Sequence, residues 1–317
     1  MNPRPVLLQA LPLLPSLERL LAERYTVQRL PAPGPDREAF LREHGAGFEG
    51  LVTSAAYGAD AALINALPRL RVISSFGVGL DKLDVAAAAQ RGIPVGYTPD
   101  VLNDCVADLA FGLLLAIGRR IPEGDRFVRT NRWSAQPPTP FPLGRRVSGA
   151  KLGIVGLGRI GRTIAQRASG FEMEVRYHSR RPVQGVAWQH APQLLELARW
   201  SDFLVVITAG GSETRHLIDA TVLEALGTKG FLVNVARGTV VDEQALVRAL
   251  QDKRIGGAAL DVYEREPHVP PELFTLDNVV LVPHIASATV QTREAMAQRV
   301  VDNLEAFFAG RALPSAA

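Results

Sequence analysis

The chain has 317 residues, 47% of them hydrophobic, which is enough for two domains that each bury a substantial core. The formal net charge is only +3 and the basic residues are dispersed, so composition does not suggest nucleic-acid binding. A single cysteine, Cys105, excludes an intramolecular disulfide framework and a metal site built from several cysteines. This cysteine usage suits a reducing compartment, and we expect the cytoplasm.

No membrane association is predicted from the apolar segments. Residues 6–14 are interrupted by Gln9 and Pro12 and are followed by charged side chains, so they indicate a strand leading into a helix rather than a signal peptide. The longest apolar helical stretch, residues 106–117, is too short to cross a bilayer. It predicts a buried helix.

Short apolar runs alternate with helical patterns through the first hundred residues, and this alternation favours a parallel sheet. The expected strands and helices cover residues 5–8, 17–23, 50–53, 61–67, 72–76 and 85–90. After the apolar helix, the proline-rich residues 136–142 predict an extended loop or arm. The second domain is expected to begin near this segment.

The sequence KLGIVGLGRIG at residues 151–161 places three glycines at a predicted strand-to-helix turn. Here Gly156 would allow the tight turn, Gly158 would let backbone approach a pyrophosphate, and Gly161 would let helix and strand pack closely. The helix N-terminus would supply free amides for the phosphates. The segment therefore predicts a dinucleotide site, and an ordinary glycine turn is the alternative.

The residues after the next predicted strand, 175–177, bear on which dinucleotide is preferred. A site selective for NAD would hold Asp or Glu there to bind the ribose 2′-hydroxyl, but this chain has Ser179, Arg180 and Arg181. A hydroxyl and guanidinium groups can bind a 2′-phosphate by charge-assisted hydrogen bonds, whereas a carboxylate would repel it. We predict that NADP(H) is preferred and that NAD(H) can also be used. The alternative is a solvated basic turn before Pro182.

The second half of the chain continues the pattern of a doubly wound nucleotide domain. Further strands are predicted at residues 203–207, 231–234, 257–260 and 279–282, and a final helix at 292–309. Three ionisable residues, Arg237, Glu266 and His284, lie just beyond predicted strands or in the loops that follow them. Because ligands of doubly wound folds bind outside the carboxyl ends of the strands, these three side chains are expected to converge.

Each of these residues suits a role in reducing a 2-oxoacid. Arg237 offers a planar fork that can bind a carboxylate and a carbonyl together. Histidine ordinarily titrates near neutrality, so His284 is the candidate acid/base, and Glu266 could accept the other imidazole N–H and fix the tautomer. Taken singly, each has a structural alternative: a surface ion pair, a solvated loop residue or a core histidine.

Several segments match one family in order along nearly the whole chain. They are SSFGVGLDKLD from Ser74, TPDVLNDCVADLAFGLLLA from Thr98, GRRVSGAKLGIVGLGRIGR from Gly144, GGSETRHLI from Gly210, NVARGTVVDE from Asn234, ALDVYEREP from Ala259 and VPHIASAT from Val282. On these motifs the chain resembles the D-isomer-specific 2-hydroxyacid dehydrogenases, most closely the glyoxylate/hydroxypyruvate reductase branch and its hydroxyphenylpyruvate reductase relatives. The chain departs from the family pattern at Ala150, at Gly211-Ser212 and at Asn103-Asp104-Cys105; the last leaves the detail of the pocket open.

The resemblance implies an α/β fold with two doubly wound parallel-sheet domains, one a flavodoxin-like substrate domain and the other a Rossmann cofactor domain, with a cleft between them. The substrate domain is expected to comprise residues 1–99 and 287–317, and the NAD(P)-binding Rossmann domain residues 100–286. A homodimer formed through the cofactor domains is also implied, with residues 120–142 as an arm. Trp133 on this arm could line a partner's pocket, although simple packing is the alternative.

The resemblance also implies roles for individual residues. The family's catalytic Arg, Glu and His fall on Arg237, Glu266 and His284, and no metal ligand is implied. The substrate contacts fall on Val78, Gly79, Arg237, His284 and Ser287, with Arg293 as a further polar position. The cofactor contacts fall on Gly156, Leu157, Gly158, Arg159, Ile160, Gly161, Ser179, Arg180, Arg181, Ile207, Val235, Ala236 and Asp261, the last of which should face the nicotinamide carboxamide.

The activity predicted from this resemblance is NADPH-dependent reduction of small 2-oxoacids such as glyoxylate and hydroxypyruvate, with the D-isomer formed where the product is chiral. His284 is the expected general acid. Two alternatives stay open: a dinucleotide-sensing corepressor of the same fold, and a related phosphite or formate dehydrogenase. The physiological oxoacid is also left open.

Overall fold

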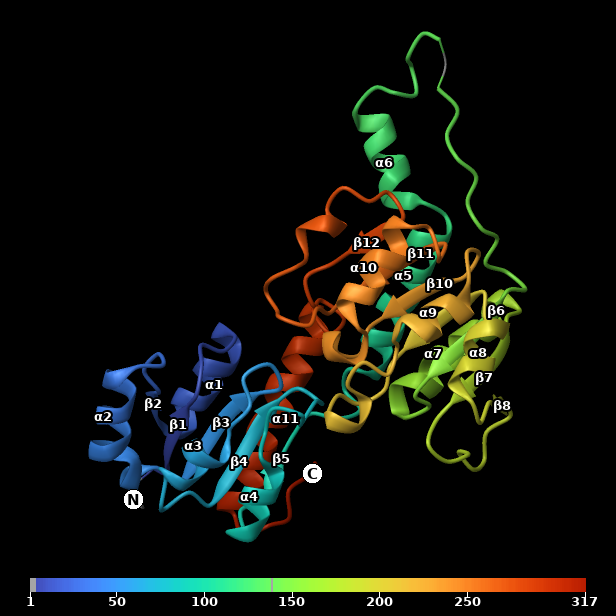
Figure 1. The fold of residues 1–317 in the computed structure, drawn as a ribbon. Helices are drawn as coiled ribbons and strands as arrows, with labels where there is room; N and C mark the ends of the chain where they lie inside the picture. Colours follow the sequence, from blue (N-terminus) through green and yellow to red (C-terminus); the bar gives the residue numbers. More distant parts are fainter. Residues whose placement is uncertain (1–3, 138) are drawn as a thin grey trace. The chain divides into compact units, whose positions relative to one another are not determined.

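The computed structural model describes residues 4–137 and 139–317, which divide into two compact units (Figure 1). Unit 1 comprises the residues up to Leu102 together with Thr289–Ala317, and unit 2 comprises Asn103–Ala288. Each unit is built on one sheet whose strands all pair in parallel, with helices between the strands. The predicted α/β class with two parallel-sheet domains is confirmed.

Unit 1 has a five-stranded sheet in the order β2-β1-β3-β4-β5, which is a flavodoxin-like order. Its strands are β1 (Val6–Gln9), β2 (Thr26–Arg29), β3 (Gly50–Ser54), β4 (Val72–Phe76) and β5 (Val95–Gly96). Its helices are α1 (Pro15–Arg24), α2 (Pro35–His44), α3 (Ala61–Asn65), α4 (Val85–Gln90) and α11 (Val290–Phe308). Helix α11 packs on β4 and β5 and against α1, and the core cluster on the other face includes residues of α3 and α4.

Local sequence explains where several of these helices begin. Pro15 and Pro35 lie in the first turns of α1 and α2, where a missing amide proton costs nothing. Asp60 and Asp84 cap α3 and α4, because each side chain accepts a hydrogen bond from a first-turn amide. Thr289 caps α11 in the same way, which starts the helix at Val290. The helix therefore begins two residues before the expected boundary.

Unit 2 has a seven-stranded sheet in the order β12-β11-β10-β9-β6-β7-β8. Its strands are β6 (Lys151–Val155), β7 (Glu174–His178), β8 (Gln189–His190), β9 (Phe203–Val206), β10 (Phe231–Asn234), β11 (Gly257–Leu260) and β12 (Val279–Leu281). Its helices are α5 (Asn103–Gly118), α6 (Ile121–Arg129), α7 (Arg159–Ala168), α8 (Leu194–Trp200), α9 (Ala220–Leu226) and α10 (Glu243–Gln251). The chain steps outward from β6 to β8 and then crosses to β9 on the other side, so the direction of winding reverses between β6 and β9.

Helix α5 packs against β10, β11, β12 and α7, whereas α8 packs against β6, β7 and α9. The core between the sheet and α8, α9 and α10 is almost entirely aliphatic, with Leu204, Val206, Leu232 and Ala258 fully buried in it. Burial on this scale holds the strand ends rigid. The loops at the carboxyl edge of the sheet are therefore built on a fixed frame.

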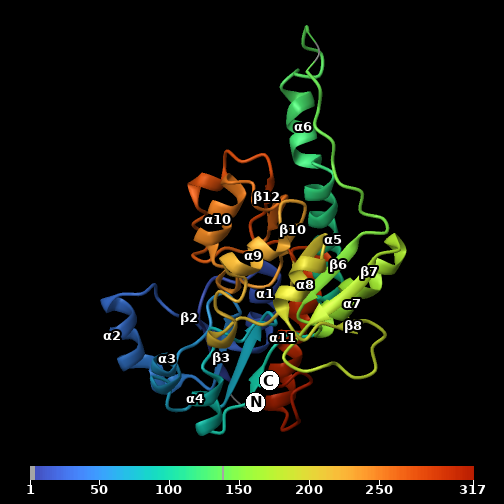
Figure 2. The ribbon, with the colours of Figure 1, turned by 45° about the vertical axis from the view of Figure 1, so that its right-hand side comes forward.

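The arm expected at residues 120–142 begins with a helix, and its proline-rich part, where described, has no helix or strand. Residues 121–129 form α6, with Pro122 in its first turn and an Asp125–Arg129 ion pair across one turn. The arm, taken as the described residues between 121 and 143, projects away from the sheet of unit 2 in both views (Figures 1 and 2). Among the described residues, no helix combines the length and hydrophobicity that crossing a membrane requires.

Candidate active site

The carboxyl edge of the unit 2 sheet gathers the predicted cofactor and catalytic residues. Because all seven strands run in parallel, the residue after each strand lies at the same edge. Gly156 follows β6, Ser179 follows β7, Ile207 follows β9, Val235 and Ala236 follow β10, Asp261 follows β11, and His284 lies three residues beyond β12. Arg237 and Glu266 stand in the loops after β10 and β11.

The glycine turn after β6 has the geometry that a pyrophosphate requires. Gly156 has φ 102°, and a Cβ there would lie 2.8 Å from the backbone of Thr208, so no other residue fits without a shift. A Cβ on Gly161 would lie 2.1 Å from the carbonyl oxygen of Gly156, which shows how closely α7 packs on the turn. Gly158 differs, because a Cβ there would meet no described atom within 4 Å. Open space beside the N-terminus of α7 is the place where a phosphate would be bound by backbone amides.

The turn after β7 carries the basic residues expected at a 2′-phosphate. Arg180 is exposed and pairs with Glu213, with 2.5 Å between Nη1 and Oε2. The Ser179 hydroxyl donates to the carbonyl oxygen of Arg181 at 2.6 Å. No acidic residue stands on the turn itself, but one reaches Arg180 from the loop that follows β9.

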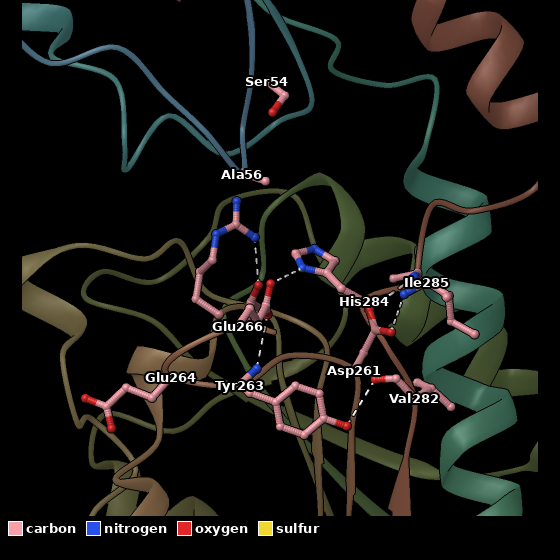
Figure 3. A network of polar contacts seen from close by, with 12 residues as sticks. Ser54, Ala56, Asp261, Tyr263, Glu264, Glu266, Val282, His284 and Ile285 are labelled. Atoms are coloured by element: carbon pink, nitrogen blue, oxygen red, sulfur yellow. Dashed lines mark hydrogen bonds and ion pairs between the residues drawn. The ribbon is translucent and has the colours of Figure 1, made fainter. Parts of the chain in front are cut away.

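Glu266 and His284 form a hydrogen-bonded pair, although they are 18 residues apart in the sequence (Figure 3). Oε2 of Glu266 lies 2.8 Å from Nδ1 of His284, and Oε1 accepts the backbone amide of Tyr263 at 3.1 Å. The side chains are 32% and 40% exposed respectively, so they remain accessible to a ligand. Since Nδ1 faces the carboxylate, Nε2 is the ring nitrogen that can face a substrate.

The pKa of Glu266 lies below its ordinary value. Burial by itself raises this pKa, but the hydrogen bond and charge of His284, the Tyr263 amide and the charge of Arg237 together outweigh burial. Glu266 is therefore a carboxylate at neutral pH. Its hydrogen bond to Nδ1 fixes the orientation of the His284 ring.

Hydrogen bonds to Asp261 fix the backbone around His284 (Figure 3). Its carboxylate accepts the amide of Ile285 at 2.6 Å and the amide of Ala286 at 3.0 Å, and its carbonyl oxygen accepts the amide of His284 at 2.8 Å. His284 has φ 53°, a left-handed conformation that non-glycine residues rarely adopt. Asp261 is fully buried, and burial raises its pKa although both amides oppose the shift.

The loop that carries Arg237 is held by a buried amide side chain. Asn234 donates from Nδ2 to the carbonyl oxygen of Arg237 at 3.0 Å and accepts the amide of Ala236 at 3.1 Å. The next residue is Gly238, where a Cβ would lie 1.9 Å from the backbone carbon of Tyr263. This close approach sets the Arg237 loop against the loop that leads to Glu266. The predicted catalytic three are thus brought together within unit 2.

Two comparisons identify the family on which this site is built. Residues 111–286, more than half of the chain, match the model of the D-isomer specific 2-hydroxyacid dehydrogenase, NAD binding domain. A glyoxylate/hydroxypyruvate reductase A from Arabidopsis thaliana is 49% identical over 297 residues, which is 94% of each chain. The chain belongs to the D-isomer specific 2-hydroxyacid dehydrogenase family. It is therefore an oxidoreductase that binds a nicotinamide dinucleotide.

Further relatives of this dehydrogenase agree with its branch of the family. A hydroxyphenylpyruvate reductase from Plectranthus scutellarioides is 47% identical over 94% of each chain. The crystal structure of an NADPH-dependent glyoxylate/hydroxypyruvate reductase from Sinorhizobium meliloti, in complex with NADP and malonate, matches with a TM-score of 0.92 and 41% identity, covering 99% of this chain and 97% of that chain. The resemblance drawn from the sequence motifs is confirmed.

The predicted substrate residues outside the catalytic three lie as follows. Val78 and Gly79 form the turn after β4 in unit 1, where Gly77 has φ 136° and donates its amide to Thr98. Ser287 follows the loop that Asp261 holds, and it is half-buried. Arg293, in the first turn of α11, lies 5.5 Å from the centroid of the Phe76 ring.

Several residues of this dehydrogenase that support the site were not singled out from sequence. Asn234 and Tyr263 fix the loops of Arg237 and Glu266, and Glu264 accepts hydrogen bonds from Arg215 at 2.7 Å and His216 at 3.2 Å. A buried Asn at the end of a strand is the kind of signal that could have indicated an anchor, because it needs partners. Glu213 left no such signal, since it is an exposed acid in a loop.

Proposed function

We propose that this dehydrogenase uses NADPH to reduce small 2-oxoacids, foremost glyoxylate and hydroxypyruvate, and that it forms the D-isomer where the product is chiral. The observation that carries the proposal is the 2.8 Å pair of Glu266 and His284 at the carboxyl edge of a dinucleotide-binding sheet. Two of the relatives described above are named as reductases of these two oxoacids, which supports the substrate class.

The bound nicotinamide supplies the hydride, and the protein supplies the proton and the orientation. Arg237 would bind the substrate carboxylate and polarise the carbonyl with its two-pronged guanidinium. His284 would donate a proton from Nε2 to the carbonyl oxygen as the carbonyl carbon accepts the hydride, and would then recover a proton from solvent. Glu266 would hold the ring through Nδ1 and so leave Nε2 directed at the substrate.

We also propose the remaining contacts that the family resemblance implies. The amides of Val78 and Gly79 would bind the substrate carboxylate, and Ser287 would contact the substrate. The glycine turn would hold the pyrophosphate, and Ser179 and Arg180 would bind the 2′-phosphate of NADPH. Residues after β9, β10 and β11, including Asp261, would line the nicotinamide end of the cofactor.

A homodimer is the assembly that we propose. Large hydrophobic side chains are exposed along the arm: Ile121, Val128, Trp133 and Leu143, with Leu143 95% exposed. A contact between the Phe127 and Phe141 rings joins the two sides of the arm, and a partner subunit would cover the exposed side chains. Multi-angle light scattering should give twice the 34.2 kDa chain mass, and a monomeric mass at micromolar concentration would refute the assembly.

Steady-state turnover with a panel of 2-oxoacids and both cofactors tests the proposed reaction. We expect the largest kcat/KM with glyoxylate or hydroxypyruvate and NADPH. His284→Ala should lower kcat by about 10²- to 10⁴-fold while NADPH still binds, because only proton transfer is lost. Arg237→Lys is the matched variant for Arg237→Ala, because it keeps the positive charge but not the planar guanidinium that can bind two oxygens together. It should therefore lose activity too.

Three results would contradict the proposal, each in a different way. Near-normal turnover of His284→Ala would remove the assigned acid. Higher kcat/KM with NADH than with NADPH would leave the reductase but overturn the cofactor preference. Tight cofactor binding without turnover of any oxoacid would favour the sensing function that proteins of this fold can also serve.

A further inference from the structure

The two side chains assigned to the 2′-phosphate both have acceptors inside the protein. Arg180 pairs with Glu213 at 2.5 Å, and the Ser179 hydroxyl donates to the Arg181 carbonyl oxygen at 2.6 Å. Glu213 belongs to the short helical turn Ser212–Thr214, which follows β9, whereas Arg180 follows β7. Strand β6 separates these strands in the sheet, so an acidic residue reaches the basic turn from two strands away.

The backbone of the basic turn is fixed independently of this ion pair. Nε2 of His190 lies 3.0 Å from the Ser179 carbonyl oxygen, and Nδ1 of His178 lies 2.9 Å from the Ala191 carbonyl oxygen. The Tyr177 hydroxyl accepts the amide of Val183 at 2.8 Å. Breaking the ion pair therefore need not move the turn, and the exchange of partners involves side chains only.

We propose that Glu213 is a specificity-determining residue for the cofactor, competing with the 2′-phosphate for Arg180. The inference rests on the proposed use of NADPH. The Arg180 and Glu213 side chains are 85% and 74% exposed, so their pairing is weak and can be exchanged on cofactor binding. Glu213 then remains near an arriving dianion that it repels, and this lowers the affinity for NADPH without a matching effect on NADH.

Glu213→Gln replaces the carboxylate with a neutral side chain of the same shape, so it tests the charge of Glu213 separately from any structural role. The probes are adenosine 2′,5′-bisphosphate and 5′-AMP, which differ only in the 2′-phosphate and leave the nicotinamide end empty. In isothermal titration calorimetry, Glu213→Gln should bind the bisphosphate about two- to tenfold more tightly than the wild type, with 5′-AMP affinity unchanged. High salt should shrink the difference, because it screens exposed charges.

Glu174→Gln is the matched control. It removes the carboxylate of an exposed Glu that pairs with the half-buried Arg176 at the opposite end of β7, where the amino ends of the strands lie. It should leave both affinities unchanged. In the cofactor assay, Glu213→Gln should also raise the ratio of kcat/KM for NADPH to that for NADH by a similar factor, whereas Glu174→Gln should not.

The outcomes separate this inference from the proposed function. Bisphosphate affinity unchanged in Glu213→Gln overturns the role of Glu213, even if the wild type prefers NADPH. Equal wild-type affinity for the two probes, with tighter bisphosphate binding in Glu213→Gln, supports Glu213 and instead overturns the NADPH preference. Equal tightening of both probes overturns the inference, because the effect would not depend on the 2′-phosphate.

Discussion

Replacing Asp261 tests whether a buried carboxylate holds the proposed catalytic histidine in place. Asp261 contacts three consecutive backbone amides: those of Ile285 and Ala286 through its side chain, and that of His284 through its carbonyl oxygen. Asp261→Ala removes the two side-chain acceptors and keeps the third. The change therefore releases the loop after His284 without altering the imidazole or Glu266.

The expected loss of unfolding free energy in Asp261→Ala follows from these contacts. Each amide left without an acceptor costs about 1–3 kcal/mol, so two of them cost about 2–6 kcal/mol. If the backbone of His284 relaxes from its left-handed conformation, about 1–2 kcal/mol of conformational strain is released. If the loop stays in place, Asp261→Ala should therefore lose about 2–6 kcal/mol of unfolding free energy. If the loop relaxes, the loss of unfolding free energy should be smaller by about 1–2 kcal/mol and kcat should fall as well.

Urea unfolding and steady-state kinetics measure the two parts of this effect. Asp219→Ala is the control, because Asp219 also accepts two backbone amides, both at 2.9 Å, but it does so at the start of α9. It should lower stability and leave kcat unchanged. NADPH affinity measured for Asp261→Ala separates a cofactor contact from the positioning of His284. An unfolding free energy within about 0.5 kcal/mol of the wild type, with kcat/KM also unchanged, would refute the reasoning.

Three further predictions follow from the site. In Glu266→Gln, kcat/KM for reduction should fall about ten- to a hundredfold, because the imidazole loses the carboxylate that orients it; an unchanged kcat/KM would contradict this. The pKa of Glu266 in the folded protein lies below the ordinary value of 4.5, so the stability that the wild type gains over Glu266→Gln should be complete above pH 4.5. This stability should disappear as the pH falls through the folded pKa, and urea unfolding from about pH 3 to 6 checks the direction of the change. Gly158→Ala should leave stability unchanged but weaken cofactor binding at least about tenfold. Gly161→Ala should instead cost about 1–3 kcal/mol of stability, because its Cβ would lie 2.1 Å from the Gly156 carbonyl oxygen. Thermal melts and cofactor titration together distinguish the two variants.

The elements that sequence patterns predicted are those that bury side chains. Strands β3, β4, β9, β10 and β11 are buried along almost their whole length, and the structure places them as internal strands of the two sheets. The strands left out of the expected set are β2, β5 and β8, and all three are edge strands. An edge strand has fewer neighbours to bury against, and β5 and β8 have only two residues each. Their hydrophobic pattern is correspondingly weak.

The active-site geometry was predictable only in part. The positions of Arg237 and His284 after strands could be read from the apolar runs, because parallel strands end at one edge. The contacts that hold these two residues could not be predicted, because they join loops that lie far apart in the sequence. Asp261 illustrates the limit: the family resemblance suggests a contact with the carboxamide, and only the structure shows that each of its carboxylate oxygens also accepts a backbone amide. The pairing of Arg180 with Glu213 was hidden for the same reason.

The loops that carry the three proposed catalytic residues are held by residues at or just beyond strand ends, and these contacts run along the edge of the sheet. Asn234, at the end of β10, fixes the Arg237 loop, and Gly238 sets that loop against Tyr263. The Tyr263 amide binds Glu266, and Asp261, at the end of β11, fixes the loop of His284 beyond β12. The His284 loop is therefore fixed from the neighbouring strand β11, whereas Arg237 and Glu266 are held by residues at or just beyond the end of the strand that each of them follows. Such alignment keeps the side chains accessible while their positions are set by the rigid sheet, which is the condition that proton and hydride transfer in one step requires.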